Sequence, residues 1–233
     1  MTLFQYHPDI LTKYPTIIGG VIIARAMTNR PSPPDLLEIY RAEQQAVIAK
    51  IGETPLSQLP SLAAWRRVFR SFGVDPTQVR SAIEALLRRL TKQGDIPSIN
   101  LLVDLGNLVS IRYALPIAMV DTRHATGAIS VHFADGSERF TNLGATEIDH
   151  PETGEVVFSD DTKLVFARRW CWRQSDQSAA RDDTSNAIIT IEGHHDGARA
   201  DVENAIRDLT ALIAAYAGGD LTHAILDKNH PSI

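Results

Sequence analysis

Hydrophobic patterning changes character midway along the chain, and this change constrains the fold more than any other feature of the sequence. Through residues 35–113, apolar side chains recur at the three- and four-residue spacing of helices. In residues 116–192, short apolar runs are separated by turn residues, as expected for β-strands. Early helices followed by late strands are typical of α+β proteins rather than of repeating βαβ units. We therefore predict an α+β fold with a mixed or antiparallel β-sheet and flanking helices.

Five segments have the spacing and end signals of helices. Ser61 is the predicted cap of the second helix, which Gly73 closes, and Asp75-Pro76 is a typical start for the third. Gly94 follows the end of that third helix. The predicted helices cover residues 35–51, 61–72, 76–92, 100–113 and 201–217.

The other apolar runs predict strands. Residues 4–6 and 15–25 have strand character, and the Gly19-Gly20 pair predicts a bend within the second run. The tail, residues 229–233, is expected to be loose. Later strands are predicted at residues 116–120, 128–133, 155–158, 164–170 and 187–192.

The 233 residues are expected to form a single domain, because a chain of this length can bury an ordinary apolar core. A composition of 44% hydrophobic and 22% charged residues is that of a globular protein. We predict a core over residues 61–195. A strand-and-helix extension precedes it in residues 1–60, and a closing helix and tail follow in residues 196–233.

Short motifs exclude several function classes. The longest apolar runs are too short to cross a bilayer and the first residues lack a signal-peptide pattern, so we expect no membrane partner and a cytoplasmic location. Gly-rich phosphate loops and zinc-finger spacings are absent from the sequence, so neither a cofactor nor a metal is expected. The run His194-His195-Asp196 could bind a metal, but it suits a single ion poorly because adjacent side chains of an extended chain point to opposite faces. We predict a solvated strand end instead.

A formal net charge of −5 argues against a dedicated nucleic-acid binder. One segment is nevertheless basic, since residues 66–92 contain seven Arg or Lys and only two acidic residues. This segment predicts weak RNA affinity, with a merely solvated helix face as the alternative. The candidate RNA-binding residues are Arg66, Arg67, Arg70, Arg88 and Arg89.

Residues 168–173 combine three arginines with two tryptophans. On a strand, the odd-numbered residues of this run would share one face and the even-numbered ones the other. Guanidinium and indole groups together can hold a phosphate and stack a base. Arg168, Arg169 and Trp170 are therefore candidate ligand-binding residues. An edge strand with buried tryptophans and solvated arginines is the alternative.

Three polar side chains lie in otherwise apolar elements. Asp104 and Asn107 are three residues apart on a predicted helix and share a face, where they belong either to a buried network or to a site. Glu192 ends an apolar strand, either at the rim of a pocket or in solvent.

Residues 97–121 resemble the start of the B3/B4 editing domain of the bacterial phenylalanyl-tRNA synthetase β subunit. The family shows an Ile-Asn…Val-Val-Asp-x-x-Asn motif, a helix and a Pro-containing turn. Ile99-Asn100, Val103-Asp104, Asn107, Pro116 and Asp121 fall in register with these features. The resemblance covers about residues 60–195, and residues 61–73, 155–161 and 168–173 look more like the free-standing members of the family.

The resemblance implies a pocket that receives the aminoacylated 3′ end of a tRNA and hydrolyses the ester. In the synthetase, this domain removes tyrosine misattached to the phenylalanine tRNA. Asn107 matches the pocket asparagine, and Glu192 matches the glutamate that recognises the misattached side chain. We accordingly expect Asn107 and Glu192 to be catalytic, and the expected substrate-binding residues are Asp104, Ala118, Arg168, Arg169 and Trp170.

Three departures from the family pattern change the expected specificity. The family histidine of the Pro-containing turn falls on Ala118, and a threonine before the pocket asparagine falls on Gly106. A small Gly-rich segment of the family is replaced by residues 167–170, which are larger and cationic. Because such groups would reshape the pocket, tyrosine specificity is not carried over to this chain.

The expected function is that of a trans-editing hydrolase which deacylates misacylated tRNA without a metal. A non-catalytic module that binds tRNA or an amino acid is the main alternative, and the loss of the turn histidine at Ala118 motivates it. The third hypothesis is a small-molecule hydrolase that has the same pocket but does not act on RNA.

Overall fold

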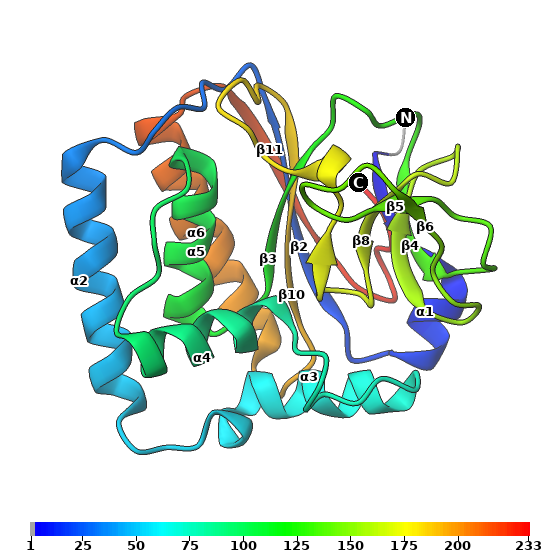
Figure 1. Ribbon diagram of the computed structural model, residues 1–233, viewed down its shortest axis with the longest axis horizontal. Helices are drawn as coiled ribbons and strands as arrows, with labels where there is room; N and C mark the ends of the chain where they lie inside the picture. The colour runs from blue at the N-terminus through cyan, green and yellow to red at the C-terminus, as the bar shows by residue number, and fades with distance from the viewer. Residues whose placement is uncertain (1–2) are drawn as a thin grey trace.

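The computed structural model describes residues 3–233 and consists of three layers (Figure 1). Four of the helices form one outer layer, a four-stranded sheet forms the middle layer and a five-stranded sheet forms the other outer layer. The remaining two helices, Pro8–Lys13 and Pro60–Ser71, pack against the core between the two sheets. The predicted α+β class is confirmed. The helices are α1 (Pro8–Lys13), α2 (Pro34–Ile51), α3 (Pro60–Ser71), α4 (Ala82–Gln93), α5 (Leu101–Tyr113) and α6 (Ala198–Tyr216).

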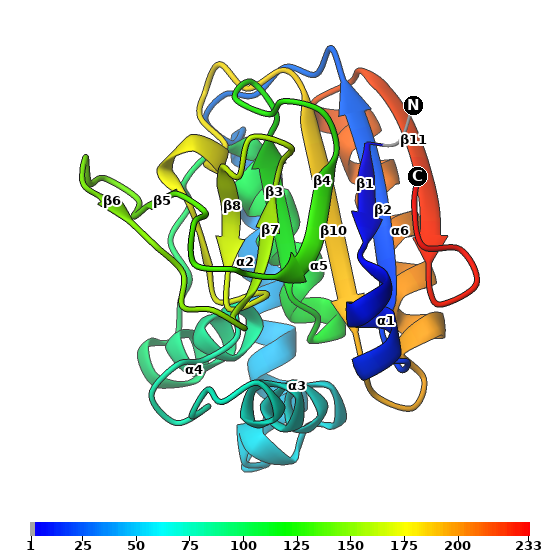
Figure 2. The same ribbon diagram turned by 90° about the vertical axis from the view of Figure 1, so that its right-hand side faces the viewer.

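The four-stranded sheet has the order β11-β2-β10-β3, and all its neighbours are antiparallel. The five-stranded sheet has the order β1-β4-β7-β8-β9, in which β1 and β4 are parallel and the other pairs antiparallel. Figure 2 shows this second sheet from its outer side. The strands are β1 (Phe4–Tyr6), β2 (Ile18–Arg25), β3 (Ile117–Asp121), β4 (Ile129–Phe133), β5 (Phe140–Thr141), β6 (Ile148–Asp149), β7 (Val156–Ser159), β8 (Val165–Arg168), β9 (Arg173–Gln174), β10 (Ala187–Gly193) and β11 (Asp220–Leu226), with β5 and β6 forming a small ribbon.

Strand β10 lies between two hydrophobic cores, which explains its continuous apolar run. Ile189 and Ile191 pack into the core shared with α2, α4, α5 and α6, whereas Ile188 packs into the core between the two sheets. Because side chains alternate along a strand, Thr190 and Glu192 share the face of Ile188. The chain thus carries a carboxylate into the space between the sheets.

Local signals at the helix starts agree with the structure for α5 but not for α3 and α4. Asn100 caps α5 by accepting a hydrogen bond from the backbone N–H of Val103 at 3.1 Å. The predicted Ser61 cap is wrong, since α3 begins at Pro60 and Leu59 occupies the cap position. The predicted start of the third helix at residue 76 is also wrong, because the Asp75 carboxylate binds Thr77 in a local turn and Ser81 caps α4 instead.

The structure near the two ends of the chain differs from the sequence-based predictions in the tail, in α1, in β2 and in β11. The tail is not loose, because the backbone of Ile233 exchanges hydrogen bonds with Leu3 at 2.7 Å and with Phe4 at 3.0 Å. The tail follows β11, an unpredicted strand that pairs along β2, and α1 was also unpredicted. The predicted bend at Gly19-Gly20 is absent, since β2 is continuous through both glycines.

The glycines of β2 serve close packing rather than bending. A Cβ atom at Gly19 would collide with the Tyr6 phenol, and one at Gly20 with the side chains of Ile206 and Val202. Glycine in a strand interior often marks such a close approach. Tyr6 and β2 are therefore fitted to one another.

We predict that Gly19→Ala destabilises the protein by about 1–3 kcal/mol, the usual cost of overpacking a core. Urea unfolding of the single variant, of Tyr6→Ala and of the double variant measures the effect as a double-mutant cycle. In the Tyr6→Ala background the alanine should cost far less, because its methyl group occupies the vacated space. Equal costs in both backgrounds would contradict this packing.

Candidate functional site

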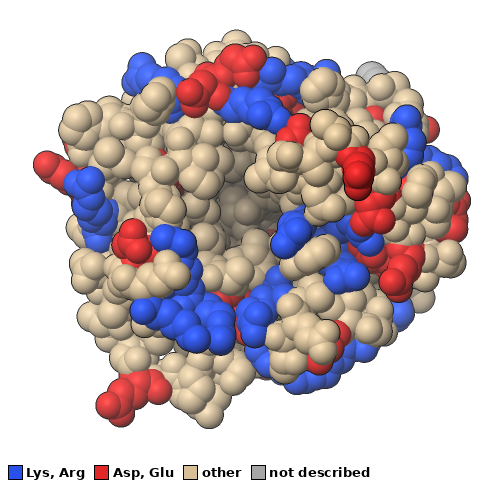
Figure 3. Space-filling view, in the orientation of Figure 1, with Lys and Arg blue, Asp and Glu red and all other residues tan. Residues whose placement is uncertain are grey.

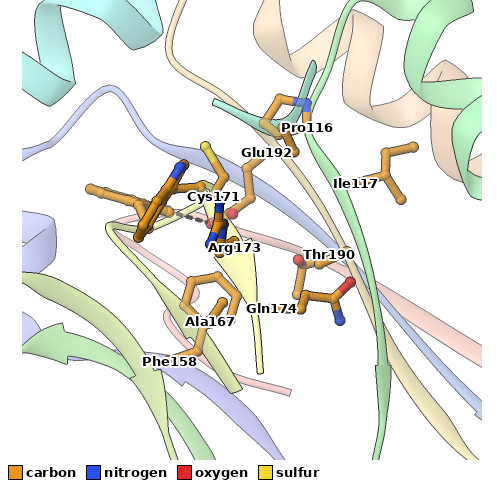
Figure 4. Close-up of a pocket in the computed structure, with 13 residues that line it drawn as sticks. Pro116, Ile117, Phe158, Ala167, Cys171, Arg173, Gln174, Thr190 and Glu192 are labelled. Atoms are coloured by element: carbon orange, nitrogen blue, oxygen red, sulfur yellow. Dashed lines mark hydrogen bonds between the residues drawn. The ribbon is translucent and has the colours of Figure 1, made fainter. Parts of the chain in front are cut away.

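A pocket lies between the two sheets, on the inner face of β3 and β10 and beside the turn that follows β8 (Figure 4). Its volume is about 100 Å³. Figure 3 shows a hollow near the centre of the corresponding face of the molecule. The lining residues are Ala82, Pro116, Ile117, Ala118, Phe158, Ala167, Trp170, Cys171, Trp172, Arg173, Gln174, Thr190 and Glu192.

Glu192 is the buried carboxylate of this pocket, with only 2% of its surface exposed. Its Oε1 atom accepts hydrogen bonds from the Tyr6 hydroxyl at 2.5 Å and from the Trp170 indole N–H at 2.9 Å. Burial raises the pKa of Glu192 to about 7, although both hydrogen bonds act in the opposite direction. Within residues 3–233, no hydrogen-bond donor is found for Oε2. Glu192 can therefore present one oxygen to a ligand and can change its charge near neutral pH.

The walls of the pocket are mainly apolar. Ala118 and Thr190 are paired across β3 and β10, while Phe158 and Ala167 come from the five-stranded sheet. Gln174 is held in place because its Nε2 donates to the Met119 carbonyl at 3.0 Å. A few polar groups in an apolar cavity are typical of a small-molecule site.

The turn after β8 aims a tryptophan at Glu192. Arg169 and Trp170 both have positive φ angles, 45° and 61°, which are uncommon for residues other than glycine. The Trp170 backbone N–H donates to the Val156 carbonyl at 2.8 Å and holds the turn. The predicted strand over residues 164–170 therefore ends early, at Arg168. The alternation of faces predicted for residues 168–173 is wrong for the same reason.

Two arginines of this segment enclose an aromatic ring at the pocket wall. The guanidinium carbons of Arg169 and Arg173 lie 4.7 Å and 4.6 Å from the centre of the Trp172 ring. Such stacking is a cation–π interaction. Trp172 and Arg173 line the pocket itself, and Arg169 lies on the other side of the indole. The rim of the pocket is therefore cationic.

Arg168 is placed outside the pocket lining. Its guanidinium makes two hydrogen bonds of 2.8 Å to the buried Glu155 carboxylate, and it also pairs with Asp149. These bonds hold the pKa of Arg168 above its usual value. The observed contacts make Arg168 a brace between β8 and the loop before β7.

Asp104 and Asn107 lie on α5, which packs on the outer face of the four-stranded sheet. The Asp104 carboxylate accepts hydrogen bonds from Ser32, Ser98 and the backbone N–H of Ile99. Asn107 lies beside the hydroxyl of Tyr40 on α2. Neither residue lines the pocket of Glu192, because the sheet lies between. The structure brings Glu192, Ala118 and Trp170 together but not Asp104 or Asn107.

Some of the basic residues of α3 and α4 already have partners within the protein, and others are exposed. Arg66 forms an ion pair with the buried Glu84, and Arg89 donates to the Asp95 carbonyl at 3.2 Å. Arg67, Arg70 and Arg88 are exposed. Figure 3 shows Lys and Arg side chains gathered below the central hollow, over the position of α4.

His194 is buried, so the predicted solvated strand end is wrong for this residue, whereas Asp196 is exposed. Its ring packs edge-on against Trp65 and Trp170, with centroid distances of 4.7 Å and 5.1 Å. Nδ1 lies 3.2 Å from the Thr16 hydroxyl, and burial lowers the pKa of His194 to about 3. β10 continues to Gly193 and carries this imidazole into an aromatic cluster that the sequence pattern did not signal.

Among residues 3–233, no three His, Cys, Asp or Glu side chains are grouped as metal ligands. No helix in this range has the length and apolar character needed to span a membrane.

The fold and the pocket define a layered α+β domain with one buried carboxylate in a mainly apolar pocket. The chain belongs to the B3/4 domain family, whose family model matches residues 64–218. The resemblance noted in the sequence is thereby confirmed.

Two relatives of this chain are subunits of a tRNA ligase. The chain is 28% identical over 94 residues to a phenylalanine–tRNA ligase beta subunit from Shewanella oneidensis, covering 40% of this chain and 12% of that protein. It is 26% identical over 175 residues to the Fusobacterium nucleatum protein of the same name, covering 65% and 21%. The chain thus spans 12% to 21% of the length of these relatives.

A solved structure is also similar. It is an N-terminal fragment of the phenylalanyl-tRNA synthetase beta subunit from Pyrococcus horikoshii. The TM-score is 0.47 at 11% identity, covering 96% of this chain and 53% of that one.

We predict that Glu192→Gln removes a pH dependence of stability. The folded-state pKa of about 7 lies above the ordinary 4.5, so the contribution of Glu192 is fully present below pH 4.5 and is lost as pH rises through 7. Urea unfolding from pH 4.5 to 8 should show a loss of up to about 1.4 kcal/mol per pH unit in the native protein that the variant lacks. Glu147→Gln, at an exposed position, is the matched control. Parallel stability curves for native protein and Glu192→Gln would contradict the raised pKa.

Proposed function

We propose that this chain is a deacylase that hydrolyses the ester bond of misacylated tRNA. The observation that carries the proposal is Glu192, a buried carboxylate with a pKa of about 7 in a mainly apolar pocket. A group that titrates near the working pH is suited to general acid–base catalysis. Membership of the B3/4 domain family and the tRNA ligase relatives support tRNA as the substrate carrier.

In the proposed step, ionised Glu192 accepts a proton from a water molecule through its unpaired Oε2. The water oxygen bonds to the ester carbonyl carbon, and the bond from that carbon to the ribose oxygen then breaks. The proton passes from Glu192 to the departing ribose hydroxyl. The products are the free amino acid and the uncharged tRNA end.

The surroundings of the pocket support contact with a polyanion. Arg169 and Arg173 stand at the rim, and the exposed Arg67, Arg70 and Arg88 lie on α3 and α4. Arginine is well suited to phosphate contacts. Asn107 enters no step of this proposal, because it lies on the other side of the four-stranded sheet.

A non-catalytic binding module is the second candidate function. The observation that favours it is the composition of the pocket: Ala118 contributes only a methyl group, and Asn107 is absent from the lining. Fewer positioned polar groups mean less stabilisation of a transition state.

The test of the proposed function is deacylation of a panel of misacylated tRNAs. The native protein should release at least one amino acid, at a rate that rises with pH through about 7 as Glu192 ionises. Glu192→Gln should lower this rate by about 10²-fold or more, whereas Glu147→Gln should not. A folded native protein that binds tRNA and releases nothing would establish the binding module instead.

The same assay decides the role of Asn107. The family resemblance predicts that Asn107→Ala abolishes turnover, whereas the observed geometry predicts a rate close to that of the native protein. A loss of turnover in Asn107→Ala, with the fold intact by circular dichroism, would contradict the assignment of the site to the Glu192 pocket.

We predict that reversing the charge of Arg67, Arg70 and Arg88 together, by substitution with Glu, weakens tRNA binding. Removing three phosphate contacts should reduce the slope of log K against log salt concentration by about 2. A triple variant with Arg25, Arg207 and Lys228 replaced by Glu is the matched control, because these three exposed cations lie on β2, on α6 and after β11. Equal binding and slopes for the two triple variants would argue against this surface.

A further inference from the structure

Tyr6 connects the N-terminal strand to the pocket. It lies on β1, outside the residues 64–218 that match the family model, and only 2% of its surface is exposed. Its hydroxyl donates to Glu192 Oε1 at 2.5 Å, and burial raises the pKa of Tyr6 well above its usual value. Gly19 leaves the space that the phenol occupies. Three strands, β1, β2 and β10, thus combine to make this one contact.

The phenol stands behind the carboxylate as seen from the pocket. Tyr6 is not among the lining residues, whereas Glu192, to which it is bonded, is. Tyr6 and Trp170 both donate to Oε1, so the carboxylate is held from two sides. The Tyr6 ring also packs edge-on against Phe4 at a centroid distance of 5.7 Å. The carboxylate is therefore backed by a well-packed ring.

The pocket is small for an aromatic ligand. Its volume is about 100 Å³, whereas a cavity of about 150 Å³ is known to hold a benzene molecule. Removing the Tyr6 ring would add the volume that the pocket lacks for an aromatic ligand. The size limit of the pocket therefore depends on a residue that does not line it.

We propose that Tyr6 is a specificity-determining residue that restricts the pocket to aminoacyl groups with short side chains. Its ring forms the back wall behind Glu192, and its hydroxyl holds the carboxylate so that Oε2 faces the ligand. Aromatic side chains are excluded because the room they need is filled by the chain's own phenol. The inference rests on the proposed function for its substrate, but not for the cavity itself.

The cavity is tested without any tRNA. Tyr6→Ala should bind p-cresol, the detached side chain of tyrosine, in NMR titrations and should be stabilised by it. Toluene should bind about tenfold more weakly, because it lacks the hydroxyl that bonds to Glu192. The native protein should bind neither. If Tyr6→Ala does not fold, Tyr6→Leu, which leaves a smaller space, is titrated in the same way. Failure of a folded variant to bind p-cresol would overturn the back-wall role.

Specificity is tested with the panel of aminoacyl-tRNAs. The ratio of kcat/KM for aromatic over short side chains should rise at least about tenfold in Tyr6→Ala. Tyr6→Phe keeps the ring and should keep the native ratio. An unchanged ratio in Tyr6→Ala would overturn the proposal.

The Tyr6 hydroxyl has a separate readout in the pH profile. Because its hydrogen bond lowers the pKa of Glu192, Tyr6→Phe should move the midpoint of the pH–rate curve upward. Cys171 and Arg173 are the other titratable or charged side chains that line the pocket, and His194 lies beyond Trp170. An unmoved midpoint would overturn the positioning role of the hydroxyl.

The two proposals can fail separately. If the native protein deacylates nothing, the proposed function fails, while the p-cresol titration still decides whether Tyr6 closes the cavity. If the native protein is active and neither the ratio nor the midpoint changes in the variants, only the inference about Tyr6 fails.

Discussion

Burial of β10 on both of its faces is the constraint on which the rest of the structure depends. One face supports the helical layer through Ile189 and Ile191, and the other meets the five-stranded sheet through Ile188. A carboxylate on such a strand is removed from water, which disfavours its charged form. Glu192 is tolerated there because Tyr6 and Trp170 donate hydrogen bonds to it. The same burial that organises the layers thus adjusts the pKa of the pocket.

The contacts that stabilise the turn after β8 also position Trp170 in the pocket. Left-handed backbone at Arg169 and Trp170 costs free energy, which the surrounding contacts must offset. The Arg168–Glu155 ion pair precedes the turn, and the aromatic cluster of Trp65, Trp170 and His194 receives the indole that follows. Strained backbone held in this way is often found where a side chain must be aimed. Here it directs Trp170 inward and leaves Arg169 and Arg173 at the rim.

The segments outside residues 64–218 take part in the same architecture. β2 lies between β10 and β11 in the four-stranded sheet, and β1 supplies the phenol that bonds to Glu192. The backbone bonds between Ile233 and residues 3–4 join the two ends of the described chain. A residue that the family model does not cover therefore donates a hydrogen bond to the carboxylate of the pocket.

The amino-acid sequence determined the helices with strong periodicity and clear caps, the late strands, and the local motif that marks the family. Asn100, for example, caps α5 through a bond to a residue three positions away, and such signals are local. Glu192 and Trp170 could likewise be singled out as candidates for a site by residue type and position.

Contacts between distant residues decided the rest. Asp104 and Asn107 share a helix face, but only the packing of α5 on the outer face of the sheet turned that face away from Glu192. The burial of His194 and the hydrogen bond from Tyr6 to Glu192 depend on partners that are distant in sequence. Hydrophobic periodicity in the sequence predicts that a side chain is buried, but it does not identify the residues against which that side chain packs. These packing partners are determined only when the layers of the fold assemble, and they set the chemistry of the pocket.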